Sequence, residues 1–262
     1  MAAGREGEGK MNVLAVDAGN TSVSFGIFRS EDNSVPKSIA VRGGVKADRD
    51  GCLAAVRDLL DFSKQVGGID RAMVASVTPS FDAALADVVR QGAKIEPRFV
   101  RWDMPMPVRL DIPCPETMGA DRIADLVATS ELYGRPAVII DIGTAVTYDL
   151  LSEDGRFFTG VIGPGPEIIA KSLNDYTALL PYVEWWKKDP PECPVDTEGA
   201  ILFGVCAGFA GMVRETADRI ARLIDGDVRR IATGGFADRF LGGMGYVIDR
   251  DLTLKGVGLL AL

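Results

Sequence analysis

The sequence predicts a mixed α/β protein made of two similar halves. An apolar strand, the turn Asp17-Ala18-Gly19-Asn20-Thr21 and a second strand recur about half a chain later around Asp141-Ile142-Gly143-Thr144-Ala145. Segments with helical apolar spacing alternate with short strand-like runs, which is typical of α/β folds. The 262 residues can bury two cores. We expect domains at 11–118 and 119–262, facing each other across a cleft that holds a nucleotide phosphate chain.

The first half begins with a hairpin-like pair of strands. Strands are expected at 12–18, 22–28, 36–42, 72–77 and 98–102, and helices near 46–65 and 81–92. The first helix is indicated by Leu53, Val56 and Leu59 at helical spacing. Ser80 is the expected N-cap of the second helix. Four prolines within 104–115 exclude a regular helix there and indicate an extended connection over the cleft.

The second half opens with a helix at 119. Further strands are expected at 137–140, 146–151, 156–162 and 229–233, and further helices near 167–175, 198–223 and the chain end, the last packing back on the first domain. Segment 182–196 contains Trp185, Trp186, three prolines and mixed charges, which indicate an exposed excursion. We assign the two tryptophans to packing or an interface.

Composition excludes several functions. The formal net charge is −8, which argues against nonspecific binding to nucleic acid or an anionic membrane, and no apolar run reaches the ~18 residues of a bilayer span. The chain has no histidine, so it cannot form a Ser-His-Asp triad or an HExxH zinc site. Four separated cysteines indicate reduced thiols in a cytoplasmic protein. Residues 1–10 are interpreted as a disordered leader.

The two aspartate turns are the strongest candidate sites. Backbone N–H groups of such a turn can bind phosphate while the carboxylate holds a cation. Asp17 would then meet a magnesium-bound phosphate, with Asn20 and Thr21 donating to phosphate oxygens. Asp141 would hold a cation, and Thr144 would contact nucleotide. The alternative is that Asp, Gly and Asn are simply turn formers, which the second copy makes less favourable.

Two further motifs are candidate sites. The first has an acidic and a basic side chain, and the second has two glycines that leave the backbone uncovered by side chains. Gly119-Ala120-Asp121-Arg122 places an acid and a base at a helix start, where Asp121 could take a proton from a hydroxyl and Arg122 could bind a carboxylate or phosphate. Helix-dipole compensation explains Asp121 equally well but does not explain Arg122. At Thr233-Gly234-Gly235, an adenine or ribose could lie against the backbone, although a plain turn is an equal alternative.

Taken in order, these motifs resemble those of type III pantothenate kinases. That family belongs to the actin-like superfamily, whose two ribonuclease-H-like halves consist of mixed sheets flanked by helices. The resemblance covers the chain after residue 10. The matching segments are 17–21, 119–122, 141–145, 164–165 with 177–181, Thr197 and 233–235.

The resemblance implies an ATP-dependent phosphorylation of pantothenate, the first step towards coenzyme A, with Asp121 as general base. It implies ATP contacts at Asp17, Ala18, Gly19, Asn20, Thr21, Ser22, Val23, Ser24, Thr144, Gly234 and Gly235. It implies pantothenate contacts at Gly119, Ala120, Asp121, Arg122, Ile112 and Thr197. Magnesium would accompany ATP at Asp17, and a monovalent cation, K+ or NH4+, would bind Asp141. The family is a cytoplasmic homodimer formed through its second half, and Thr197 would reach the partner's pantothenate site.

The substrate side departs from the family pattern. Ile112 and Cys114 stand where members commonly have Tyr and Asn, and Asp196 adds a negative charge beside Thr197. Two alternatives to an active pantothenate kinase therefore stay open. One is a kinase of a related small hydroxyl compound, and the other is a catalytically silent nucleotide-binding regulatory homologue.

Overall fold

The two copies of the repeat form the central strands of two separate sheets. The computed structural model describes residues 10–43 and 48–262, so the expected leader lies outside the described residues except for Lys10. Packing divides the chain into two units. Unit 1 comprises Met1–Pro107, Cys114–Leu132 and Asp251–Leu262, and unit 2 comprises Val108–Pro113 and Tyr133–Arg250.

The sheet of unit 1 has the order β3-β2-β1-β4-β5. Its strands are β1 (Asn12–Ala18), β2 (Ser22–Arg29), β3 (Ser34–Arg42), β4 (Arg71–Ser76) and β5 (Arg98–Phe99). Strands β1, β2 and β3 form an antiparallel meander, while β4 and β5 run parallel to β1. The first four confirm the expected strands, and β5 is shorter than expected.

The sheet of unit 2 repeats this topology. Its strands are β6 (Arg109–Leu110), β7 (Ala137–Ile142), β8 (Ala145–Leu151), β9 (Arg156–Pro164), β10 (Arg229–Thr233) and β11 (Val247–Ile248), in the order β11-β10-β7-β8-β9-β6. Strands β7, β8 and β9 form the meander, and β10 and β11 run parallel to β7. Strand β6, from the proline-rich connection, adds to the edge at β9. The expected duplication is therefore confirmed at the level of sheet topology.

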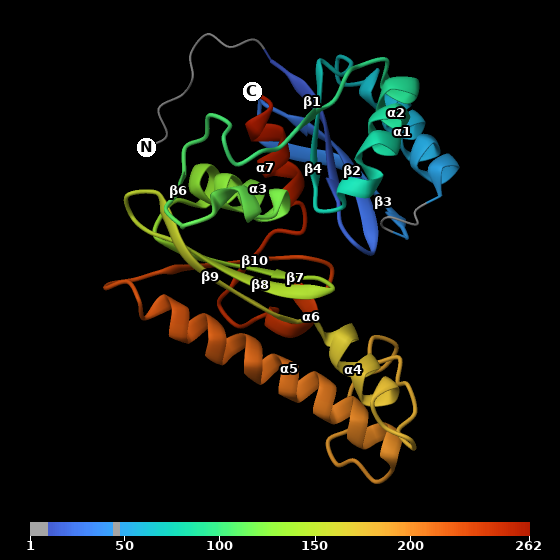
Figure 1. Ribbon diagram of the computed structural model, residues 1–262, viewed down its shortest axis with the longest axis vertical. Coiled ribbons are helices and arrows are strands. Elements are labelled where there is room, and N and C mark those ends of the chain that lie inside the picture. Colours follow the sequence, from blue (N-terminus) through green and yellow to red (C-terminus); the bar gives the residue numbers. More distant parts are fainter. Residues whose placement is uncertain (1–9, 44–47) are drawn as a thin grey trace. The chain divides into compact units, whose positions relative to one another are not determined.

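Helices cover both faces of the first sheet (Figure 1). They are α1 (Arg49–Ser63), α2 (Asp82–Ala93), α3 (Ala120–Ala128) and α7 (Leu252–Leu260). Helices α1 and α2 lie on one face, and α7 with α3 lies on the other. The expected N-cap Ser80 is wrong, because the tight turn Pro79–Phe81 precedes α2 and places Phe81 at its cap position.

The C-terminal helix packs tightly within unit 1. A Cβ atom on Gly256 would overlap the Ala124 carbonyl of α3, so α7 approaches α3 at backbone distance. Arg71 donates to the main-chain oxygen atoms of Ala261 and Leu262. Helices α3 and α7 thus belong to the first unit by packing, whereas the expected boundary at residue 119 stays a prediction about independently folding domains.

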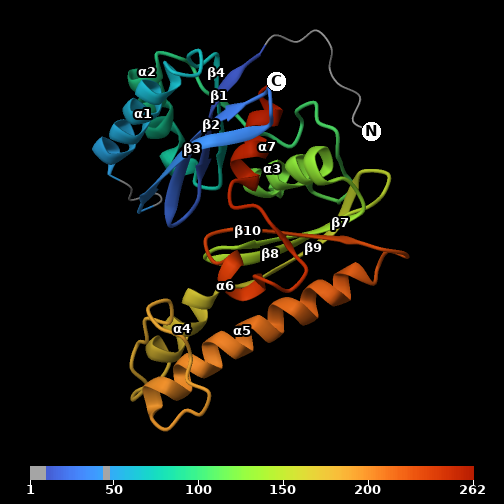
Figure 2. The ribbon, with the colours of Figure 1, turned by 180° about the vertical axis from the view of Figure 1, so that it is seen from behind.

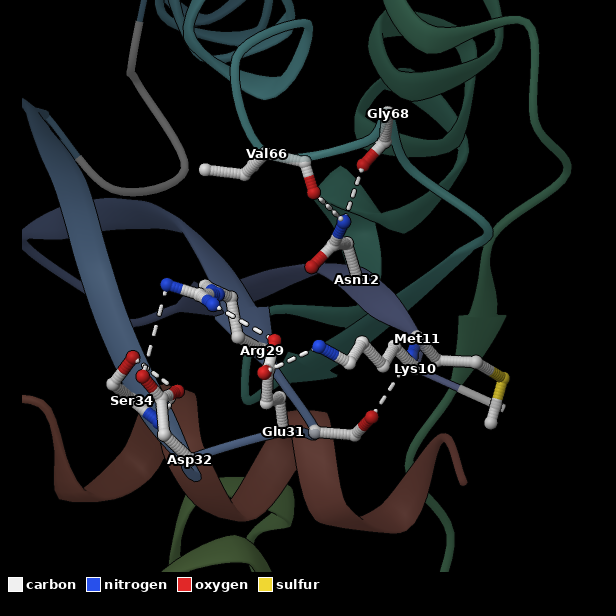
Figure 3. Close-up of polar contacts among 10 residues, drawn as sticks. Lys10, Met11, Asn12, Arg29, Glu31, Asp32, Ser34, Val66 and Gly68 are labelled. Carbon is white, nitrogen blue, oxygen red and sulfur yellow. Dashed lines mark hydrogen bonds and ion pairs between the residues drawn. The ribbon is translucent and has the colours of Figure 1, made fainter. Parts of the chain in front are cut away.

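The first strand is fastened at its beginning by a side-chain amide. Asn12 Nδ2 donates to the carbonyls of Val66 and Gly68 at 2.8 and 3.0 Å (Figure 3). The Asn12 N–H donates to Asp70. These bonds hold the turn after α1 against β1. They satisfy backbone carbonyls that would otherwise lack partners in a part-buried loop.

The core of unit 2 lies between its sheet and helices α4 (Pro166–Asp175), α5 (Thr197–Ala221) and α6 (Ala237–Leu241). Helix α5 runs along one face of the sheet and extends beyond it to α4, as Figures 1 and 2 show. The expected exposed excursion is wrong for Trp185, whose side chain is fully buried among Phe236 and Phe240. The order of the segments along the sequence does not show that Trp185 contacts these two phenylalanines.

Helix α5 also bears on membrane association. Within the part of the chain that the structure describes, it is the single helix long and apolar enough to cross a bilayer, and 39% of its most apolar stretch is buried. The core helix of a soluble protein meets the same criterion. Length and composition therefore do not distinguish the two situations here.

Candidate active site

The first aspartate turn lies at the end of the central strand of unit 1. Asp17 is the penultimate residue of β1 and is paired with Ser24 of β2 and Ala75 of β4. The turn is closed by the Gly19 N–H, which donates to the Ser22 carbonyl at 3.0 Å. The expected phosphate-binding residues 17–24 are therefore one continuous strand-turn-strand feature.

The second aspartate turn occupies the equivalent place in unit 2. Asp141 is the penultimate residue of β7 and is paired with Thr147 of β8 and Thr233 of β10. Here the Gly143 N–H donates to the Ala145 carbonyl at 3.0 Å. Each aspartate thus has one antiparallel and one parallel neighbour strand. Unrelated turns would not be expected to share this register.

Two glycines close around the second turn. A Cβ atom on Gly234 would overlap Asp141 Oδ1 and the Ile142 backbone, and Gly234 has φ +91°. A Cβ atom on Gly165 would overlap the carbonyl oxygens of Gly143 and Thr144. Both positions therefore require glycine for the backbones to approach. In the sequence, the only signal for the contact at Gly165 is the Pro164-Gly165 pair itself, which is equally typical of an ordinary turn.

Asp121 lies at the start of α3, as expected. Its Oδ1 accepts from the Arg122 N–H at 2.7 Å, and Gly119 occupies the N-cap position without a side-chain cap. Burial raises the pKa of the Asp121 carboxyl above its usual range, although the Arg122 N–H and guanidinium act in the opposite direction. A partly desolvated carboxylate is a stronger base than a solvated one.

Asp121 and the first turn are brought together through Val77. The Val77 N–H, directly after β4, donates to the Ala18 carbonyl at 3.1 Å. Its side chain lies 3.4 Å from the place that a Cβ atom on Gly119 would occupy, while Asp121 Oδ1 lies even closer to that place. The start of α3 therefore sits beside the end of β4, next to the strand that carries Asp17. No local pattern singled out Val77.

The remaining expected substrate contacts belong to unit 2. Thr197 is exposed and begins α5, while Ile112 is half-buried beyond β6. Asp196 caps this helix, because its Oδ1 accepts from the Gly199 N–H at 2.7 Å. The extra negative charge beside Thr197 thus has a structural role in addition to any effect on an anionic substrate.

The oxygen atoms around Asp141 suit a hard cation. The Asp141 carboxylate and the Ile142 carbonyl lie beside Gly234, whereas the Gly143 and Thr144 carbonyls of the same turn lie beside Gly165. Carboxylate and carbonyl oxygens are the ligands that such cations prefer. Among residues 10–43 and 48–262, no group of three or more His, Cys, Asp or Glu side chains is placed to hold a metal ion.

The fold and the paired aspartate turns define an actin-like α/β protein. Solved structures agree at the level of fold. The ethanolamine utilization protein EutJ from Carboxydothermus hydrogenoformans has TM-score 0.57 at 16% identity, covering 97% of this chain and 90% of its own. The activator of 2-hydroxyisocaproyl-CoA dehydratase from Clostridium difficile has TM-score 0.57 at 12% identity, covering 96% and 94%.

Sequence comparison identifies the family. The type III pantothenate kinase profile matches residues 13–219. A protein of that name from Agathobacter rectalis is 34% identical over 253 residues, covering 94% of this chain and 95% of the relative. The chain belongs to the type III pantothenate kinase family.

Proposed function

We propose that this protein transfers the γ-phosphoryl group of ATP to the primary hydroxyl of pantothenate, the first step of coenzyme A biosynthesis. The observation that carries the proposal is the family match over 13–219, which includes both aspartate turns and Asp121. The departures at Ile112, Cys114 and Asp196 leave the two turns and Asp121 intact.

Asp121 is the proposed general base. It accepts the hydroxyl proton as the substrate oxygen bonds to the γ-phosphorus and ADP leaves with the electron pair of the broken P–O bond. Phosphoryl transfer requires mainly positioning and charge stabilisation, so one well-placed carboxylate suffices. The raised pKa of Asp121 and its place beside β4 support this role. Arg122, with Gly119, Ala120 and Ile112, is proposed to bind pantothenate, the guanidinium facing its carboxylate, and Thr197 is proposed to reach the pantothenate site of the partner subunit.

The ATP contacts are assigned to both aspartate turns and the Gly-Gly turn. In unit 1 they comprise residues 17–24, whose backbone N–H groups and hydroxyls suit phosphate oxygens. In unit 2 they comprise Thr144, Gly234 and Gly235. Mg²⁺, when bound with ATP, would neutralise charge on the phosphates, and Asp17 is the residue proposed to hold it. Asp141 is the proposed ligand of a monovalent cation, K+ or NH4+.

The active form is proposed to be a cytoplasmic homodimer that needs no nucleic acid or membrane. Helix α5 supports this through an outward face of small and apolar residues. Phe203 is 41% exposed on that face, and added Cβ atoms on Gly204, Gly208 and Gly211 would meet nothing within 4 Å. A second copy could therefore approach α5 closely.

The test is ADP release from purified protein with ATP, magnesium, potassium and pantothenate. Pantothenate-dependent ADP is the expected result, and its dependence on potassium rather than sodium would support the cation assignment. Ile112, Cys114 and the exposed Asp196 beside Thr197 favour a second candidate, a kinase of a related small hydroxyl compound. Turnover in a panel of such compounds, with none for pantothenate, would favour that candidate. ATP binding without any turnover would instead indicate a silent homologue.

A further inference from the structure

Glu167 lies outside both aspartate turns and accepts hydrogen bonds from two aromatic side chains. It lies in the first turn of α4, where Oε1 accepts from Tyr182 Oη at 2.7 Å and Oε2 accepts from Trp185 Nε1 at 3.1 Å. Burial, followed by the bond to Glu167, raises the pKa of Tyr182, so its hydroxyl stays a donor at neutral pH. Both carboxylate oxygens therefore tie segment 182–196 back to the start of α4.

Trp185 is held from its other side by α6. Its ring lies 4.7 Å from Phe236 and 5.6 Å from Phe240, measured between centroids. The Arg239 guanidinium lies 5.8 Å from the ring, and Arg239 Nη2 donates to the carbonyls of Trp185 and Lys188 at 3.3 and 2.8 Å. These contacts fix both the side chain and the backbone of the segment.

Helices α4 and α6, whose residues contact Trp185, follow the two glycine-containing turns that pack against the Asp141 turn. Glu167 follows Gly165 closely, and Gly165 packs against residues 143 and 144. Phe236 follows Gly234 and Gly235, and its N–H donates to the Ile142 carbonyl at 3.3 Å. Trp185 therefore connects α4 and α6, the helices that follow the turns proposed to bind the cation and the nucleotide. At its other end the same segment leads into Thr197.

We propose that Glu167 and Trp185 are positioning residues that set the affinity for the phosphoryl acceptor by fixing the segment that ends at Thr197. The inference rests on the proposed function, because Thr197 is assigned to pantothenate there. The physical reason is preorganisation. Segment 182–196 has no regular helix or strand, so without these anchors binding would have to order it at an entropic cost.

The test is a comparison of Glu167→Gln with Glu184→Gln. Both remove one carboxylate charge, but Glu184 is exposed and its side chain accepts from Lys187 of the same segment and does not hydrogen-bond Tyr182 or Trp185. For Glu167→Gln we expect KM for pantothenate to rise about tenfold, with kcat and KM for ATP within about twofold of wild type, because the amide nitrogen that replaces one carboxylate oxygen cannot accept and the charge that strengthens both bonds is lost. Glu184→Gln should match wild type. Trp185→Phe, which keeps an aromatic ring but is smaller and lacks the N–H, should show a smaller rise in the same KM because the Tyr182 bond to Glu167 remains.

A merely structural role would give a different pattern. It would lower the active fraction, and hence kcat, without changing KM for pantothenate, and that result would overturn the inference. Hydrogen exchange of peptides within 182–197 provides a readout independent of activity. We expect faster exchange in Glu167→Gln and unchanged exchange in Glu184→Gln, and equal exchange in both would also overturn it. Wild-type protein that turns over no pantothenate would refute the proposed function, whereas active wild type with an unchanged Glu167→Gln would refute only this inference.

Discussion

Gly234 lies so close to Asp141 that no side chain fits between them. An added Cβ atom would overlap Asp141 Oδ1 and would come within 2.6 Å of the Ile142 nitrogen. The Gly-Gly turn after β10 therefore shapes the surroundings of the carboxylate on β7. This contact connects two motifs that the sequence presents separately.

Replacing Gly234 by Ala should lower the free energy of unfolding. The positive φ of +91° costs about 1–3 kcal/mol for a residue with a side chain, and the overlap with Asp141 adds a strain of similar size, about 1–3 kcal/mol. Urea unfolding measures the loss. Gly235→Ala is the matched control, since an added Cβ there meets nothing within 4 Å. Equal stability of the two variants would contradict the contact.

Replacing Asp121 by Asn should reduce turnover while leaving ATP binding intact. Loss of a general base typically costs about 10²–10⁴ in rate. Because burial raises the pKa of Asp121 in the folded protein, its ionised form at neutral pH opposes folding, and the variant should be as stable as wild type or more so. Steady-state kinetics and urea unfolding check the two parts. Undiminished turnover would remove Asp121 from the base role.

The pH dependence of kcat/KM should report the ionisation of the Asp121 carboxyl. A base works only when deprotonated, so kcat/KM should be full above the pKa of Asp121 and should fall as pH drops through it. Since burial raises that pKa, the acid limb should lie above the usual aspartate range of about 4. The limb should be absent from the residual activity of Asp121→Asn. A profile flat down to the usual aspartate range would count against the assignment.

Replacing Asp141 by Asn should abolish the stimulation by potassium. The amide keeps the shape of the side chain but removes the charge that would balance a cation. ADP release in potassium and in sodium should then be equal. Asp154→Asn is the control, because Asp154 is an exposed residue on the β8–β9 turn that pairs with Arg156. Retained potassium stimulation in Asp141→Asn would place the cation elsewhere.

Replacing Phe203 by Glu should shift the protein from dimer to monomer. The side chain is 41% exposed on the outward face of α5, and a buried charge there would lack a partner. Light scattering after gel filtration measures the mass. Leu223→Glu, at an exposed position just beyond α5, should stay dimeric. A Phe203→Glu dimer of unchanged affinity would show that another surface is used.

The sequence was sufficient for the repeated features of the fold. Alternating and apolar runs predicted the β1, β2, β7 and β8 strands, and the aspartates fell at equivalent register positions. Local pattern succeeds here because each strand is specified by its own side chains. The two-residue strand β6 was missed because the surrounding prolines hide an edge pairing with β9.

Contacts distant in sequence could not be predicted in this way. The sequence assigns Trp185 to packing or an interface within an exposed segment, but it does not show that the buried ring packs against Phe236, far along the chain. Asp121 was found as a candidate, but its proximity to the first turn depends on Val77, which carries no distinctive pattern. Such pairings follow from tertiary packing, which no window of the sequence contains.

The place of α7 has a consequence for synthesis on the ribosome. Unit 1 contains the first strand and also the last helix, which packs backbone-close against α3 and near β1. Unit 2 is encoded between them, so all of it has been translated before unit 1 is complete. Until α7 emerges, the part of the sheet face that α7 covers stays exposed, and the nascent chain must avoid aggregation through that apolar surface.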